Sequence, residues 1–309
     1  MSLERTSDTR PIKDTTPEGP AQPDKSTHAA SIGIEDLLIS FDTRRGTVDA
    51  VHDVNLFIPA GEFTAIVGPS GCGKSTILNA IAGLRKPQQG TVRLDGEVVR
   101  KVSKSVGYLF QKDALLPWKT VLRNVALPLI IRGVPRKEAH ERAREWLSRV
   151  RLDGFEDYYP HQLSGGMKKR VALAAVFVYE PTVMLMDEPF SALDVQTRNL
   201  MENELLDLWT VSRPTVVFVT HDLEEAIGLS DRVVVFSAGP GTVKCEYQID
   251  LPRPRSLTEI RFADGFEAQY ENIWGDLRSE VLAAYAQQQA LKSSKAAKSG
   301  KSGSADGSS

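Results

Sequence analysis

A glycine-rich segment has the residue types and the setting needed to hold phosphate. It follows the apolar run 63–67, precedes a helical pattern over 76–84, and reads Gly68-Pro69-Ser70-Gly71-Cys72-Gly73-Lys74-Ser75-Thr76. Glycines let the backbone wrap closely around an anion, and the N-terminus of the following helix adds positive potential. We predict that this whole run binds a nucleotide, with Lys74 on the β- and γ-phosphates and Ser75 on Mg²⁺. A glycine-rich turn before a helix is the alternative.

Two adjacent carboxylates follow a second apolar run. Asp187 and Glu188 come directly after residues 183–186. Open α/β sheets bind ligands at the carboxyl ends of their strands, so two acids at such an end indicate a cation or a reaction. We predict that Asp187 orients the Mg²⁺ shell and that Glu188 is the general base for the water that attacks the γ-phosphate. Two acids in an ordinary turn are the alternative.

Two further polar residues follow runs of the same kind. His221 comes after 215–220, and Gln111 comes after 106–110. The histidine could contact the γ-phosphate, and the glutamine amide could reach Mg²⁺ or the attacking water. Alone, neither residue indicates a site, because a single histidine is often structural and a glutamine in a loop is uninformative. With Glu188 they complete the predicted catalytic set.

The composition excludes several kinds of function. The chain has 309 residues and a net charge of -2, so no overall basic field attracts nucleic acid or acidic lipid. Its longest apolar runs are far shorter than the roughly 20 residues that cross a bilayer. The first residues lack the apolar core of a secretory signal, and two cysteines, Cys72 and Cys245, provide no disulfide framework. These features favour a cytosolic protein.

Apolar and amphipathic runs alternate across the middle of the chain, which predicts an α/β domain. A helix is expected to begin at Pro135 and to end before Gly154. The expected strands are 63–67, 105–110, 182–186 and 215–220. These strands would position the polar residues that follow them.

Four segments are expected along the chain. Residues 1–32 are polar and proline-rich, and residues 291–309 are rich in Ser, Gly, Ala and Lys, so we predict a disordered leader and a flexible tail. Residues 33–255 are the predicted ATP-binding domain, and residues 256–290 are a predicted helical appendage. The apolar face of that appendage is predicted to contain Phe266, Ile273, Leu277 and Val281.

Another glycine-rich segment separates this chain from other phosphate-loop proteins. It reads Leu163-Ser164-Gly165-Gly166-Met167. A serine hydroxyl and glycine N–H groups at a helix start can bind γ-phosphate oxygens, although an ordinary helix N-cap explains the same pattern. Together with the phosphate loop, Gln111, Asp187-Glu188, Ser191-Ala192-Leu193-Asp194 and His221, it resembles the ATP-binding cassette (ABC) family over residues 34 to about 250.

The resemblance implies the ABC ATPase fold, which has a phosphate-loop nucleotidase core, an antiparallel β subdomain and a helical signature subdomain. In that family, the Leu-Ser-Gly-Gly segment of one protomer closes over the ATP held by the other. Ser164, Gly165 and Gly166 would therefore act on the ATP of a second copy, within a two-fold dimer. Phe41 stands where the family stacks an aromatic ring on adenine, with a core phenylalanine as the alternative.

Two residues after the signature segment depart from the family pattern. Lys169 stands where many relatives have Gln, and Ala175 stands where many have Arg. Neither change removes a group assigned to ATP, although the helix surface near a partner could differ. All catalytic motifs are intact, which predicts an active ATPase rather than a degenerate regulatory copy.

Two finer features resemble the nitrate, sulfonate and taurine importer branch. They are Leu115-Leu116-Pro117-Trp118 followed by Thr120-Val121-Leu122, and Leu251-Pro252-Arg253-Pro254-Arg255. The first could also be a socket for a partner helix, with core packing as the alternative. The resemblance implies a bacterial complex of two ATPase subunits, two transmembrane permease subunits and a periplasmic solute-binding protein. This chain would lie at the cytoplasmic face of the inner membrane and bind no nucleic acid.

We therefore predict the ATP-binding and hydrolysing subunit of a bacterial importer of small solutes, with ATP and Mg²⁺ as its ligands. ATP would close the dimer, hydrolysis at Glu188 would reopen it, and the Gln111 loop would transmit the motion to the permease subunits. The alternative is a soluble ABC ATPase that acts on the ribosome or on nucleic acid. Such relatives carry a second cassette, a coiled coil or a zinc-binding insertion, which this sequence lacks.

Overall fold

The computed structural model describes residues 29–43 and 46–301, with side chains described through residue 290. Residues 1–28 of the predicted leader and residues 302–309 of the predicted tail lie outside this range. The limits of the predicted domains therefore remain predictions at both ends of the chain.

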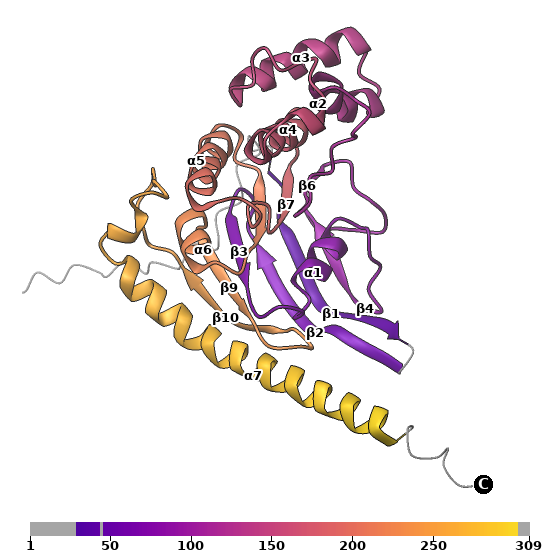
Figure 1. Cartoon of the computed structure of the whole chain (residues 1–309), viewed down its shortest axis with the longest axis vertical. Coiled ribbons are helices and arrows are strands. Elements are labelled where there is room, and N and C mark those ends of the chain that lie inside the picture. Colours follow the sequence, from indigo (N-terminus) through magenta and orange to yellow (C-terminus); the bar gives the residue numbers. More distant parts are fainter. Residues whose placement is uncertain (1–28, 44–45, 302–309) are drawn as a thin grey trace, which may run out of the picture.

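A six-stranded sheet forms the centre of the fold (Figure 1). Its strands are β3 (Phe63–Val67), β6 (Val106–Leu109), β7 (Val183–Asp187), β8 (Thr215–Val219), β9 (Arg232–Phe236) and β10 (Val243–Gln248). The order is β10-β9-β3-β8-β7-β6, and all neighbours are parallel except β10 with β9. The parallel strands are buried apolar runs, as a sheet covered on both faces requires.

A second, antiparallel sheet packs beside the first. It contains β1 (Ile32–Thr43), β2 (Gly46–Ile58), β4 (Gln89–Leu94) and β5 (Glu97–Val98), in the order β2-β1-β4-β5. Helix α1 (Lys74–Ile81) joins this sheet to the central one, because its buried Ile77 packs in one apolar core with Ile39 of β1 and Leu185 of β7. The phosphate loop is thus held between two sheets.

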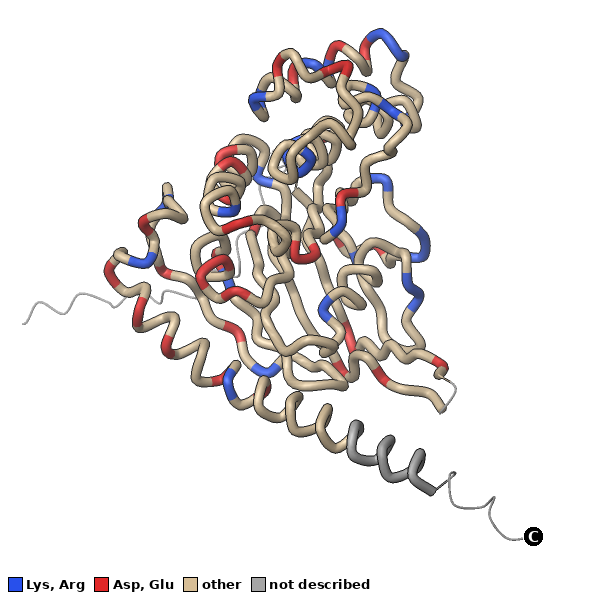
Figure 2. Tube along the Cα trace, in the orientation of Figure 1, with Lys and Arg blue, Asp and Glu red and all other residues tan. Residues whose placement is uncertain are grey.

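Helices cover the other face of the central sheet. Three of them, α2 (Val121–Ile131), α3 (Arg136–Arg149) and α4 (Gly165–Phe177), form a separate layer at the top of Figure 1. Helices α5 (Val195–Ser212) and α6 (Leu223–Leu229) follow β7 and β8. The charges of α3 are mixed, with Lys and Arg interspersed among Glu (Figure 2). The predicted α/β class, with an antiparallel β subdomain and a helical subdomain, is confirmed.

The C-terminal helix α7 (Phe266–Lys301) runs along the outer side of β10 (Figure 1). Ile273 and Leu277 are buried as predicted, but Val281 is 40% exposed, so its predicted place on the apolar face is wrong. After Leu277 the contacts are polar: Glu280 accepts a hydrogen bond from Ala238 N at 2.8 Å and lies 3.0 Å from Lys244 Nζ of β10. The backbone of the predicted flexible tail is helical as far as Lys301. No helix of the described residues is long and apolar enough to cross a membrane.

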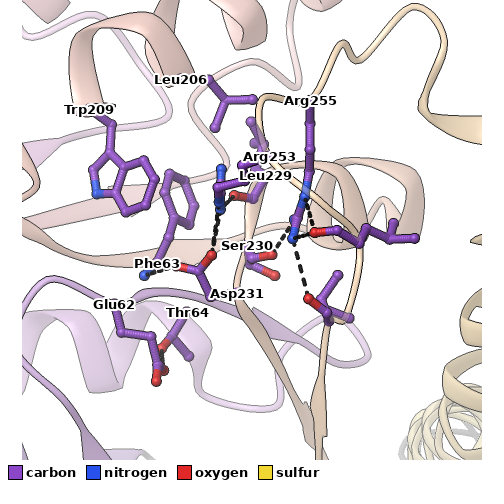
Figure 3. Close-up of polar contacts among 12 residues, drawn as sticks. Glu62, Phe63, Thr64, Leu206, Trp209, Leu229, Ser230, Asp231, Arg253 and Arg255 are labelled. Atoms are coloured by element: carbon purple, nitrogen blue, oxygen red, sulfur yellow. Dashed lines mark hydrogen bonds and ion pairs between the residues drawn. The ribbon is translucent and has the colours of Figure 1, made fainter. Parts of the chain in front are cut away.

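Two arginines fasten the segment after β10 to the core (Figure 3). Arg253 donates from Nε and Nη2 to Asp231 Oδ1 at 2.9 and 2.8 Å, and its guanidinium carbon lies 4.5 Å from the Trp209 ring centre. Burial lowers the pKa of Arg255 to about 10, which leaves it charged at neutral pH. Arg255 donates to the backbone carbonyl oxygens of Ile227, Ser230, Ile249 and Leu251.

Replacing Arg255 with methionine is expected to lower the free energy of unfolding by about 2–4 kcal/mol, because several partly buried carbonyls lose their donor. Urea unfolding followed by circular dichroism measures the change. Arg261→Met is the matched control, because Arg261 forms an exposed ion pair with Glu224, 3.2 Å apart, and should cost less than about 1 kcal/mol. Equal effects of the two changes would mean that Arg255 does not fasten this segment.

Candidate active site

The phosphate loop requires glycine immediately before α1. Gly73 has a φ of 93°, and a Cβ at this position would lie 2.4 Å from Val51 Cγ1 and 2.7 Å from Ala50 O. A side chain is therefore excluded by both backbone conformation and space. The loop packs directly against β2, which fixes its curvature.

Lys74 is the buried cation of this loop. It is 7% exposed, and its Nζ donates to Gly68 O at 2.8 Å and Pro69 O at 3.0 Å. An ammonium at a helix N-terminus, within reach of the loop backbone, is well placed to bind an anion. Burial raises the pKa of the Cys72 thiol, which keeps the thiol protonated and unreactive. Cys72 thus offers the site its backbone rather than its side chain.

Ser75 and Asp187 bring two oxygens together at the start of α1. Ser75 Oγ donates to Asp187 Oδ1 at 3.0 Å. Burial raises the pKa of Asp187, and the hydrogen bond from Ser75 acts in the opposite direction. Hydroxyl and carboxylate oxygens are ligands that Mg²⁺ prefers, so both residues fit the predicted Mg²⁺ site. The described residues contain no cluster of three or more His, Cys, Asp or Glu side chains suited to a metal.

Glu188 occupies an unusual backbone conformation at the end of β7. Its φ is 43°, in the left-handed region that glycine favours, and its N–H donates to Val219 O of β8 at 2.9 Å. Such strain in a non-glycine residue is common at functional sites. The carboxylate lies between two polar side chains, since Oε2 is 3.3 Å from Gln111 Nε2 and 3.4 Å from His221 Nδ1. One oxygen of Glu188 therefore has both predicted catalytic neighbours within reach.

The sheet topology explains why these residues meet. The phosphate loop, His221, Glu188 and Gln111 follow β3, β8, β7 and β6, which are consecutive and parallel in the central sheet. The carboxyl ends of parallel neighbours lie at one edge, where open α/β sheets bind ligands. The site is therefore assembled from four strand ends that are distant in the sequence.

The predicted signature segment begins helix α4, in the helical layer. Ser164 is the N-cap, and its Oγ accepts a hydrogen bond from Met167 N at 3.3 Å. Ser164 and Gly165 are exposed. Among the described residues, no hydrogen bond or ion pair connects Ser164, Gly165 or Gly166 with the phosphate loop. The cap of α4 and the loop before α1 are thus separate surfaces of one chain.

Phe41 lies on β1 and is 41% exposed, so the alternative of a core phenylalanine is wrong. The Arg85 guanidinium carbon lies 4.3 Å from the centre of its ring. A partly exposed aromatic face can accept a planar stacking partner. The position is compatible with the predicted contact to adenine.

Comparison with known proteins identifies the family. A family model described as ABC transporter matches residues 51–191. An aliphatic sulfonates import ATP-binding protein of Bacillus cereus is 42% identical over 234 residues, which cover 76% of this chain and 92% of that protein. The chain belongs to the ABC transporter family.

Two other similar proteins agree with this assignment. A nitrate import ATP-binding protein of Synechocystis is 45% identical to this ABC protein over 219 residues, which cover 71% of this chain and 82% of that protein. A solved dimeric ATP-binding cassette in a post-hydrolysis state, bound to ADP and Pi, has a TM-score of 0.64 and 34% identity, and the match covers 71% of this chain and 98% of that one. The ABC ATPase fold predicted from the motifs is confirmed.

Sequence reasoning assigned no role to several residues beside the ABC site. Ser191 Oγ lies 3.4 Å from Gln111 Nε2 and donates to Glu188 O at 3.0 Å. Lys169, noted only as a departure from the family pattern, is 3% exposed and contacts Gln111 O at 2.9 Å. Ser191 belongs to the segment Ser191-Ala192-Leu193-Asp194, and Lys169 departs from the family pattern, so the sequence contains a signal for both residues.

Proposed function

We propose that this chain is the ATP-binding and hydrolysing subunit of a bacterial importer of small solutes of the nitrate, sulfonate or taurine kind. The main support for ATP hydrolysis is the position of Glu188 Oε2, which lies within 3.4 Å of Gln111 Nε2 and His221 Nδ1. These residues are at the carboxyl ends of the strands, where the phosphate loop also lies. The importer part is supported by the relatives named for sulfonate and nitrate import.

In this proposal the phosphate loop holds the triphosphate of ATP, with Lys74 on the β- and γ-phosphates. Ser75, Asp187 and Gln111 would hold Mg²⁺, which when bound neutralises charge on the phosphates. Glu188 accepts a proton from the attacking water, and Gln111 and His221 keep its carboxylate oriented. The remaining residues of the loop are Gly68, Pro69, Ser70, Gly71, Cys72, Gly73 and Thr76. All of them except Pro69, which has no N–H and only shapes the loop, can bind phosphate through the backbone N–H. Phe41 stacks on adenine.

The same proposal requires a second copy of the chain. Ser164, Gly165 and Gly166 form a helix N-terminus whose first two residues are exposed, and such a terminus suits an anion. Within the described residues, they make no hydrogen bond to their own phosphate loop. A head-to-tail pair would bring this cap onto the ATP of the other copy. The similar cassette solved as a dimer supports this arrangement.

Permease subunits are the proposed partners on the membrane side, and they place the chain at the cytoplasmic face of the inner membrane. A groove of about 290 Å³ lies beside the segment after β6, between α2 and α4, and its lining includes Leu115, Ile131 and Ala175. Trp118 and Ile131 are 70% and 73% exposed. The apolar side chains and the groove suit a helix from such a subunit. A periplasmic solute-binding protein would complete the complex without contacting this chain.

The test is reconstitution with the permease subunits that copurify with this chain. In proteoliposomes that contain the complex and its solute-binding protein, ATP hydrolysis and uptake are expected to rise together when nitrate, a sulfonate or taurine is supplied. Removal of Mg²⁺ with a chelator should stop both. ATP hydrolysis stimulated instead by ribosomes or nucleic acid, with no membrane complex formed, would favour the alternative of a soluble ABC ATPase.

A further inference from the structure

A buried lysine of helix α4 contacts the loop that contains Gln111. Lys169 is 3% exposed, and its Nζ lies 2.9 Å from Asp113 Oδ1, 2.9 Å from Gln111 O and 3.4 Å from Phe110 O. All three oxygens belong to the short segment that follows β6. An ammonium removed from water requires such partners, because an unpaired buried charge is strongly unfavourable. Lys169 and this segment are therefore bound to each other.

The contact fixes the backbone of the residue whose side chain reaches the catalytic base. Lys169 binds the carbonyl oxygen of Gln111, while Gln111 Nε2 lies 3.3 Å from Glu188 Oε2 and 3.4 Å from Ser191 Oγ. The main chain of Gln111 is thus held from α4, while its side-chain amide reaches Glu188 and Ser191. Small displacements of a positioned group are enough to slow a reaction substantially.

A neutral glutamine at position 169 could not replace these contacts. Lysine is longer and carries a full charge, so it binds a carboxylate and two carbonyls at once. Asp113 is 25% exposed and supplies the negative charge that matches the buried ammonium. The pair Lys169 and Asp113 therefore couples α4 to the segment after β6 through opposite charges.

We propose that Lys169 is a positioning residue for ATP hydrolysis, which sets the amide of Gln111 against Glu188 by holding the Gln111 backbone. The inference rests on the proposed ATPase function and adds a residue to it. Lys169 contacts no reacting atom, so it acts only through Gln111. It should therefore influence the rate of turnover and leave ATP binding by the phosphate loop unchanged.

The test compares Lys169→Met, Gln111→Ala and the double variant in steady-state ATP hydrolysis. Lys169→Met is expected to lower kcat about tenfold with KM for ATP within about twofold of the parent. The kcat of the double variant should equal that of Gln111→Ala within about twofold, because both changes act through the same positioned amide. Lys137→Met is the control, since Lys137 is exposed on α3 in the same helical layer, and it should leave kcat unchanged.

Thermal unfolding of each variant separates loss of fold from loss of positioning. If Lys169→Met does not fold, Asp113→Asn replaces it, because this variant keeps both carbonyl contacts and should lower kcat about threefold. A folded Lys169→Met or Asp113→Asn variant with the parental kcat overturns the inference. The inference is also overturned if Lys169→Met lowers kcat as much in the Gln111→Ala background as it does in the parent. A parent that does not hydrolyse ATP overturns the proposed function as well. An active parent with an inactive Glu188→Gln variant leaves the proposed function intact.

Discussion

Glu188→Gln is expected to reduce ATP turnover by about 10³-fold or more while the affinity for ATP stays within a few-fold of the parent. Glutamine has nearly the same shape as glutamate but cannot accept a proton, and general-base catalysis typically contributes about 10²–10⁴-fold. Glu188 Oε2 lies between Gln111 and His221, so the substitution removes the proton acceptor and leaves its neighbours in place. Phosphate release at saturating ATP and equilibrium ATP titration measure the two quantities.

Glu141→Gln provides the matched control, because Glu141 is exposed on α3 and undergoes the same chemical change far from the strand ends. It should leave both turnover and affinity at the parental values. Parental turnover in Glu188→Gln would show that another group accepts the proton. Loss of ATP binding together with turnover would show that Glu188 shapes the site rather than acting as its base.

Lys74→Ala is expected to weaken ATP binding by about 10²-fold or more and to lower hydrolysis accordingly at a fixed ATP concentration. A hydrogen bond to a charged group contributes about 1.5–3 kcal/mol, and about 1.4 kcal/mol corresponds to a tenfold change in affinity. Lys74 is buried within the loop, so water cannot substitute well for its ammonium. Titration of each protein with ATP and Mg²⁺ under identical conditions measures the change.

Lys86→Ala serves as the control for Lys74, because Lys86 lies a few residues after α1 and is exposed. Its removal changes the net charge by the same amount and should leave ATP affinity unaltered. If Lys74→Ala bound ATP as tightly as the parent, the glycine-rich loop would not be the phosphate site. If both variants weakened binding equally, the effect would come from overall charge.

Most of the site could be predicted because each residue follows a recognisable strand. Glu188, His221 and Gln111 come directly after apolar runs that the structure has as β7, β8 and β6. Parallel strands place such residues at one edge, whatever their distance in the sequence. The phosphate loop was recognisable for the same reason, since it lies between β3 and α1.

The rest depended on packing that no local pattern encodes. Lys169 and Gln111 are 58 residues apart, and only the docking of α4 beside β6 brings the ammonium to the carbonyl. Val281 follows the helical spacing of Ile273 and Leu277, which are buried, yet its own side chain is 40% exposed. Phe41 is on a strand whose exposed residues occur next to buried ones without strict alternation. In each case the contacts and burial of the side chain depend on the neighbouring element rather than on the residue type alone.

The most direct measurement is the molecular mass of the Glu188→Gln protein in solution, with and without ATP and Mg²⁺, by size exclusion with light scattering. If the nucleotide is held between the phosphate loop of one copy and the Ser164 cap of another, the protein should have the mass of one chain without ATP and of two chains with ATP. Adding Ser164→Arg should keep the protein at one chain while ATP still binds. A Glu188→Gln protein that binds ATP yet has the mass of one chain under every condition, alone and in the detergent-solubilised complex, would contradict the shared site.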